Sequence, residues 1–151
     1  MACEFLYNPV QEVALNAPIL FDTSIPCTKG NVYHEGNTGN FILRGSNGNG
    51  CNQFAQYQVT FNGNIAIPTG GTVAPIAVAL AVNGEPRLTS RAIFVPAAVE
   101  DYGNVTSTAI IKVPKCCCFS LSVDAVPAST TETPAPVIEV QNANLTIARI
   151  A

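Results

Sequence analysis

The chain has 151 residues, of which 48% are hydrophobic and 11% are charged, and its net charge is -3. A chain of this length can bury one substantial core, so we expect a single domain. The seven basic residues are scattered, and no basic stripe follows a phosphate backbone, which excludes nucleic acid as an expected partner.

The low charged fraction predicts self-association. Charged residues make up about a quarter of a typical soluble domain, so a monomer of this chain would expose an unusually uncharged surface. Obligate interfaces between identical subunits are depleted in charge and resemble a domain core cut in half. We therefore expect other copies of the chain to cover part of this surface.

The amino-terminal segment does not have the pattern of a secretory signal. It lacks a cationic start, and Glu4 and Glu12 interrupt its apolar residues. No stretch of the chain is long and apolar enough to span a bilayer, so no membrane partner is expected. Residues 1–9 are apolar but too short for a domain, and we expect them to form an anchoring arm before a domain over residues 10–151.

The first half of the chain predicts short strands and many turns. Residues 10–21 are mostly apolar and proline-framed, as in an edge strand or a pair of short strands. Residues 28–53 are rich in glycine and asparagine, which favour tight turns, around one short strand at 40–44. Residues 56–67 then alternate strictly between apolar and polar side chains, the pattern of a half-buried strand.

The second half continues the alternation. Residues 75–82 place isoleucine, valine and leucine on one face and alanine on the other, so another surface can approach the alanine face closely. The turn at Asn83-Gly84 follows, although Pro86 argues against a two-residue hairpin there. Further strands are predicted at 89–95, 104–114, 117–126 and 137–150, with a polar proline-containing loop at 128–136. The pattern predicts an all-β, single-domain antiparallel sandwich, either immunoglobulin-like or a jelly roll.

Four of these strand segments resemble a known superfamily. They are QYQVTFNGNIAI, IAVALAVNGEP, VTSTAIIKV and the terminal VQNANLTIARI. Together they resemble the trimeric jelly rolls of the tumour necrosis factor (TNF) and C1q superfamily, in the divergent form found in bacterial and phage surface proteins. The resemblance covers residues 10–151 and implies a jelly-roll homotrimer. It also implies inner-sheet or trimer contacts at five positions, namely Tyr57, Val59, Phe61, Leu145 and Ile147.

Six cysteines stand out, at Cys3, Cys27, Cys51, Cys116, Cys117 and Cys118. They contain no CxxC pair and the chain has one histidine, so they do not form a zinc-ribbon pattern. Neighbouring cysteines cannot easily bridge each other, and in an extended strand Cys116 and Cys118 lie at the long end of disulfide reach. Three interpretations remain open: buried free thiols, disulfides within the chain or to a second subunit formed in an oxidising setting, and a metal or cluster site.

No pattern of catalytic residues is found. The chain lacks nucleophile and phosphate-binding motifs, and no histidine stands beside a pair of carboxylates, so we expect neither an enzyme nor a cofactor. His34 is interpreted as a solvated or turn-supporting residue. The Glu100-Asp101 pair is interpreted as a solvated turn rather than a calcium site, because no third carboxylate is close in sequence. Asn104 and Asn144 begin glycosylation-like triplets that we interpret as chance.

These observations favour a non-enzymatic structural protein. The expected role is a homotrimeric decoration or head-fibre-like component on the surface of a phage capsid, made in the bacterial cytoplasm without a signal peptide and located on the virion. Its partners would be other copies of itself and a larger protein assembly. The alternatives are a trimeric adhesion module that binds a glycan or host receptor through loops 45–53 or 128–136, and a spore-surface protein.

Overall fold

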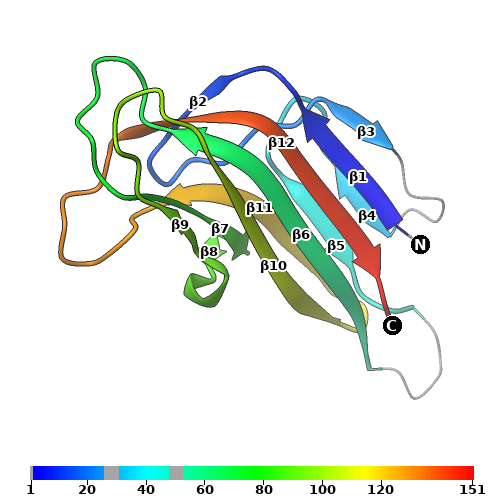
Figure 1. Ribbon diagram of the computed structural model, residues 1–151. Coiled ribbons are helices and arrows are strands. Elements are labelled where there is room, and N and C mark those ends of the chain that lie inside the picture. The colour runs from blue at the N-terminus through cyan, green and yellow to red at the C-terminus, as the bar shows by residue number, and fades with distance from the viewer. Residues whose placement is uncertain (1, 26–30, 48–52) are drawn as a thin grey trace.

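The computed structural model describes residues 2–25, 31–47 and 53–151 (Figure 1). Within these ranges the chain forms twelve β-strands and one short 3-10 helix, η1 (Leu88–Ser90). The strands form two antiparallel sheets of six strands each, which face each other. The predicted single-domain antiparallel sandwich is therefore confirmed. No helix in the described ranges has the length and hydropathy needed to cross a membrane.

The first sheet contains both ends of the chain. Its strands, in spatial order, are β10 (Gly103–Pro114), β6 (Phe54–Ala66), β12 (Val137–Arg149), β1 (Ala2–Tyr7) and β3 (Thr23–Ile25), with β2 (Gln11–Ala14) paired beside β12. The longest strands, β6 and β12, lie side by side in its middle. The last strand of the chain is therefore held between a strand from its middle and a strand from its start.

The second sheet is built from shorter strands. In spatial order it contains β4 (Val32–His34), β5 (Phe41–Arg44), β11 (Cys118–Val126), β7 (Ile76–Val82) and β8 (Glu85–Pro86), with β9 (Ala92–Phe94) also paired to β7. Buried Ser90 of η1 joins this sheet to the first, because the Ser107 hydroxyl of β10 donates to the Ser90 carbonyl and the Leu80 amide of β7 donates to Ser90 Oγ.

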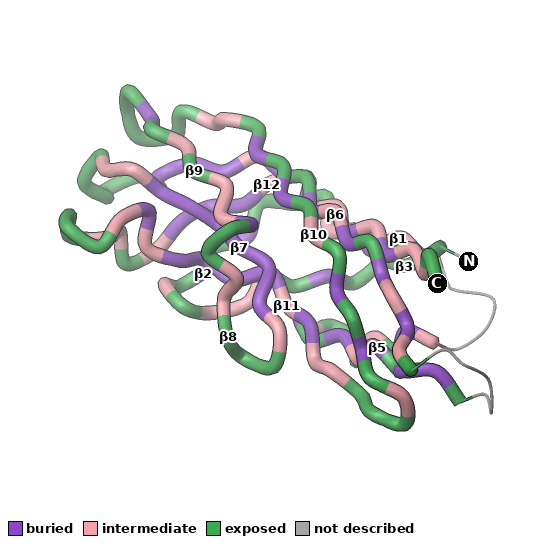
Figure 2. The backbone as a smooth tube through the Cα atoms, turned by 90° about the horizontal axis from the view of Figure 1, so that it is seen from below, coloured by how far each residue is buried: buried purple, intermediate pink, exposed green. Residues whose placement is uncertain are grey.

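The core lies between the sheets and follows the period-two alternation of the strands. Buried and exposed segments alternate along β6, β10 and β12 in Figure 2. The largest side chains with less than 2% of their surface exposed include Tyr57, Phe21, Phe41, Phe61, Leu80, Leu121 and Leu145. At about 25 cal/mol per Å² of apolar surface, their burial is the main favourable contribution to folding.

The alanine face of β7 packs within the chain. Ala77 and Ala79 are at most 1% exposed and cluster with Val126 of β11 and with Ala128, just after that strand. The close approach predicted for this face is therefore made by the chain itself.

The turn after β7 differs from the expectation. Asn83 and Gly84 have φ of 52° and 82°, and Val82 pairs directly with Glu85 across them. Two positive φ values in a two-residue loop are typical of a type I′ hairpin. The prediction that Pro86 prevents such a hairpin was wrong, because β8 is a two-residue edge strand, where a missing amide hydrogen is tolerated.

Residues 1–9 also differ from the expectation. Residues 2–7 form β1, which pairs with β12 over six positions and with β3 over three. Cys3 and Phe5 are 2% and 4% exposed, and the Phe5 ring lies 4.6 Å from the Phe41 ring between their centroids. The described part of the expected arm is thus a core-forming strand of the domain.

A pair of substitutions on β1 tests this placement. Phe5→Ala removes a buried ring and is expected to lower the free energy of unfolding by about 3–5 kcal/mol. Leu6→Ala, on the partly exposed opposite face of the same strand, is expected to cost much less. Urea unfolding of both variants measures the difference. Equal and negligible losses would show that this segment is an arm and not part of the core.

Candidate interaction face and cleft

The outer face of the first sheet carries amide and hydroxyl side chains in rows. Because paired residues share a face, Asn104, Asn64 and Gln141 form one row across β10, β6 and β12, and Thr106, Asn62 and Asn144 form the next. Thr108, Thr60 and Thr146 form a third row. We call these three rows the amide face.

Hydrogen bonds hold the amide face in place. Thr60 Oγ1 and Thr108 Oγ1 lie 3.1 Å apart, and Asn104 Nδ2 donates to Asn62 Oδ1 at 2.8 Å and to Asn64 Oδ1 at 3.1 Å. These bonds join β6 to β10. The face is therefore a sheet surface of fixed donors and acceptors that carries no charge of its own.

Charged groups lie at the borders of the amide face. Lys112 follows the rows along β10, with Nζ 4.3 Å from the centroid of the Phe54 ring. On the opposite side, Glu4 of β1 accepts a 2.6 Å hydrogen bond from Asn144 Nδ2. The two borders thus carry opposite charge.

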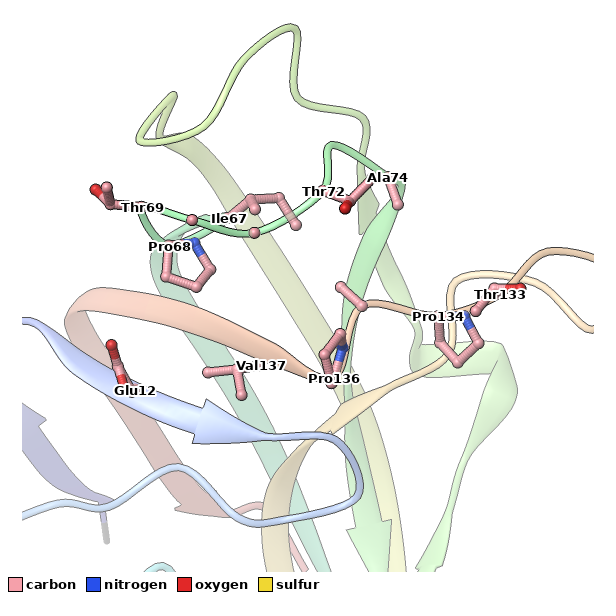
Figure 3. A pocket seen from close by; sticks show the side chains of 13 residues that line it. Glu12, Ile67, Pro68, Thr69, Thr72, Ala74, Thr133, Pro134, Pro136 and Val137 are labelled. Carbon is pink, nitrogen blue, oxygen red and sulfur yellow. The ribbon is translucent and has the colours of Figure 1, made fainter.

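A cleft of about 600 Å³ opens at the end of the sandwich farthest from the termini. Loop 67–74 forms one wall and loop 133–137 the other, while Glu12 of β2 extends toward the space between them (Figure 3). The described lining is mostly apolar, with Pro68, Pro134 and Pro136, and Glu12 is its charged member. Such a concave, mostly apolar site with a few polar groups is typical of ligand pockets.

Beside the cleft, two carboxyl groups join three segments of the chain. Glu100 Oε1 accepts hydrogen bonds from the Thr69 amide at 3.0 Å and from Thr69 Oγ1 at 2.9 Å. Tyr102 OH donates to Glu139 Oε2 at 2.5 Å, and the side chains of Glu139 and Glu100 are hydrogen-bonded to each other. We call this group of Thr69, Glu100, Tyr102 and Glu139 the carboxyl clasp. It connects loop 67–74, the segment before β10 and strand β12.

The two carboxyl groups of the clasp have opposite pKa shifts. Burial raises the pKa of Glu139, which is 8% exposed. The hydrogen bond from Tyr102 lowers this pKa, whereas the hydrogen bond and charge of Glu100 and the charge of Glu12 raise it. The hydrogen bond from Thr69, followed by that from Glu139, lowers the pKa of Glu100. Burial and then Glu139 raise the pKa of Tyr102. As the pH falls, Glu139 is therefore expected to take up a proton before Glu100 does.

The carboxyl clasp was not predicted from the sequence. The Glu100-Asp101 pair is exposed, with Glu100 in a turn, as interpreted. In addition, Glu100 binds Thr69, and Asp101 Oδ2 accepts from the Ala97 amide at 3.2 Å. The signal that could have found it is Glu139, an acidic residue at an otherwise apolar start of a strand. In the described ranges no three histidine, cysteine or carboxylate side chains are placed to hold a metal ion.

The five positions expected as inner-sheet or trimer contacts lie inside the sandwich. Tyr57, Val59, Phe61, Leu145 and Ile147 are each 0% exposed. They contact the core of their own chain and have no surface to offer another copy. Tyr57 OH donates to the carbonyls of Arg44 and Asn31, which ties β6 to the second sheet.

The cysteines fall into two groups. Cys3 is buried and disulfide-bonded, whereas Cys116, Cys117 and Cys118 are free and exposed. Cys27 and Cys51 lie outside the described residues. The interpretation as buried free thiols therefore does not fit any described cysteine.

The single histidine supports a turn. His34 Nε2 lies 2.9 Å from the Thr38 carbonyl, and its ring stacks on Phe41 with a 4.5 Å centroid distance. This geometry fits the turn-supporting interpretation.

The clasp makes stability depend on pH in a defined direction. Because the folded-state pKa of Glu139 is raised, its contribution to stability is full below the ordinary value of 4.5 and is lost as pH rises through the raised pKa. Glu100, with a lowered pKa, has the opposite sign, and its contribution is lost as pH falls through that pKa. Glu139→Gln keeps both hydrogen bonds without a titrating group. We expect the variant to lose less stability than the parent between about pH 5 and about pH 8.

Urea unfolding across this pH range measures the effect, with Glu132→Gln in an exposed loop as the matched control. Burial also raises the pKa of Asp124, but this group is present in all three proteins and cancels in the comparison. Identical pH profiles for the parent and Glu139→Gln would contradict the assignment.

Comparison with known proteins agrees with this architecture. No family model and no curated protein sequence matches the chain. Among solved structures, it is similar to the globular domain of a zebrafish complement 1qA protein, with a TM-score of 0.60, 12% identity and coverage of 99% of this chain and 97% of that one. It is similar to murine APRIL, with a TM-score of 0.62, 7% identity and coverage of 99% and 98%. It is also similar to the Eiger TNF of S. frugiperda, with a TM-score of 0.63, 13% identity and coverage of 100% and 92%. The chain therefore has the TNF/C1q-like jelly-roll fold that the resemblance of its strand segments implied.

Proposed function

We propose that this chain forms a homotrimer through its amide face and serves as a non-enzymatic structural component on the surface of a larger assembly, with a phage capsid as the leading candidate. The fold supports a self-associating module of the kind that the resemblance to the TNF and C1q superfamily implies. The observation that carries the proposal is the amide face, a broad surface of the first sheet without charge.

The chemistry of the amide face suits burial against a second copy. Removing its amides and hydroxyls from water costs little when partners replace the lost hydrogen bonds, and copies of the same rows offer both donors and acceptors. The next row along the sheet consists of Ile110, Gln58 and Ala148, and its outer two residues add apolar surface. The face could therefore be buried without leaving a charge unpaired.

The charges at its borders suit a closed ring. When identical copies are related by rotation, one border of each copy meets the opposite border of the next. Lys112 on the β10 border and Glu4 on the β1 border have complementary charges for such a contact. Complementary charge favours correct register and faster association more than it adds affinity.

A charge placed in the middle row tests the interface. In Thr60→Lys, assembly would bury an unpaired ammonium, at a cost of about 3–5 kcal/mol, which corresponds to about a hundredfold or more in association. We expect light scattering coupled to size-exclusion chromatography to give the mass of three copies for the parent and of one copy for this variant. Thr130→Lys, in the exposed loop before β12, is the matched control and is expected to stay trimeric.

The parent protein also tests the proposal by itself. A soluble single copy at micromolar concentration would overturn the trimer, and an unchanged mass for Thr60→Lys would overturn the amide face as its interface. The structural role is tested separately, by asking whether the protein co-purifies with particles from its source and whether Thr60→Lys abolishes that association.

The end cleft favours a second candidate, a module that recognises a glycan or receptor. Its loop 133–137 belongs to the segment that the sequence singled out for recognition. In this case the trimer would present three clefts, and multivalent binding would compensate for weak single sites.

Filling the cleft tests this second candidate. Thr133→Trp places an indole at the lining, so retention on a glycan array or on host cell walls is expected to fall by about tenfold or more. Thr130→Trp, in the same loop but outside the lining, is expected to bind as the parent does. Retention that is absent in the parent, or unchanged in Thr133→Trp, would exclude recognition through this cleft.

A further inference from the structure

The turn between β10 and β11 presents three neighbouring free thiols. Cys116, Cys117 and Cys118 are all exposed and unpaired. Free cysteine is among the residue types most often buried in folded proteins, and an exposed thiol is open to exchange and oxidation. Three exposed free thiols in one turn therefore suggest a chemical role for this turn.

Backbone contacts hold this turn in place. The Gly45 amide donates to the Cys117 carbonyl at 2.8 Å, the Cys116 amide donates to the Ser46 carbonyl at 3.2 Å, and the Lys115 amide donates to the Gln53 carbonyl at 2.8 Å. A Cβ atom at Gly45 would lie 1.9 Å from the Pro114 carbonyl oxygen, so this close approach requires glycine.

The conformation of the turn also breaks the alternation expected of a strand. Cys116 has φ of 62°, in the left-handed region that favours glycine and asparagine, and β11 begins only at Cys118. The thiols therefore project from a turn at the surface and do not enter the core. Cationic side chains flank them, because Lys115 precedes the three cysteines and Arg44 pairs with Cys118 in the sheet.

We propose that this turn is a covalent linking site, at which a thiol of one copy forms a disulfide with the same turn of a second copy. A two-fold contact between identical turns brings the same residues together, which is the simplest arrangement for a self-complementary link. The turn lies at the end of the sandwich that carries both termini (Figure 1). It is therefore away from the cleft and outside the rows of the amide face, and the link does not depend on the proposed trimer.

The reaction needs a small-molecule disulfide, and oxidised glutathione is a suitable one. A thiolate of the turn attacks one sulfur of oxidised glutathione, the sulfur–sulfur bond breaks, and one glutathione leaves as the thiol. A thiolate of the second copy then attacks the protein sulfur of this mixed disulfide and releases the second glutathione. Two protein thiols are oxidised and one oxidised glutathione is reduced to two thiols. Lys115 and Arg44 favour the approach of this anionic reagent.

The experiment measures cross-linking of the folded protein by millimolar oxidised glutathione, with non-reducing electrophoresis and mass spectrometry of the unreduced peptides. The parent is expected to form a covalent two-chain species whose linked peptides both contain residues 116–118. The variant with serine at all three positions is expected to lose this species while keeping its circular dichroism spectrum and mass in solution.

A control thiol at the other end of the sandwich shows whether cross-linking depends on this turn or occurs between any two exposed thiols that collide. In the background with serine at 116–118, Thr130→Cys places one exposed thiol in the loop at the opposite end. Counted per pair of thiols, we expect it to cross-link at least about tenfold more slowly than the parent, because a favourable contact raises the effective concentration of reacting groups. Equal rates would overturn the proposal. Glutathione adducts alone, or a disulfide between Cys116 and Cys118 of the same chain, would also overturn it.

Discussion

The pairing of β6 with β10 on one side and β12 on the other is the constraint on which the rest of the structure depends. It fixes the register of three long strands, and with it the direction of every side chain they carry. Tyr57, Phe61 and Leu145 point into the core because of this register. The same register aligns the amides and hydroxyls of the outer face in rows. A shift of one residue in β6 would turn its core side chains outward and its amide side chains inward. The interactions that stabilise the core therefore also fix the amide face.

The few charged side chains of the chain are distributed unevenly, and their positions say more about possible contacts than their number does. Three carboxyl groups, those of Glu12, Glu100 and Glu139, lie at or beside the cleft. At the other end, the cations Lys115 and Arg44 flank the thiol turn. The amide face lies between them. The composition that predicts self-association therefore corresponds, in the structure, to an uncharged sheet surface between a cleft bordered by three carboxyl groups and a turn flanked by two cations.

The sequence predicted most of the fold because alternation is a local property. The strands at 56–67, 75–82, 104–114 and 137–150 match β6, β7, β10 and β12 to within two residues at each end. It missed β1, because six residues with an acidic member do not distinguish a strand from an arm until β12 is in place to pair with them. It missed the carboxyl clasp for the same reason, since Glu100 and Glu139 meet only through the topology. The unusual conformation of Cys116 also depends on contacts with residues about seventy positions earlier, which no local pattern contains.

The opposed ends of the sandwich would allow the proposed structural role and the proposed recognition role to coexist. Antiparallel register places the termini and the thiol turn at one end of β10, β6 and β12, and the cleft with its clasp at the other. In a trimer whose threefold axis runs along these strands, each end of the assembly would carry three copies of one feature. Linking two copies through their thiol ends would leave the clefts facing away from the link. The arrangement of the first sheet therefore allows covalent linking, self-association and ligand binding on separate surfaces of the same small domain.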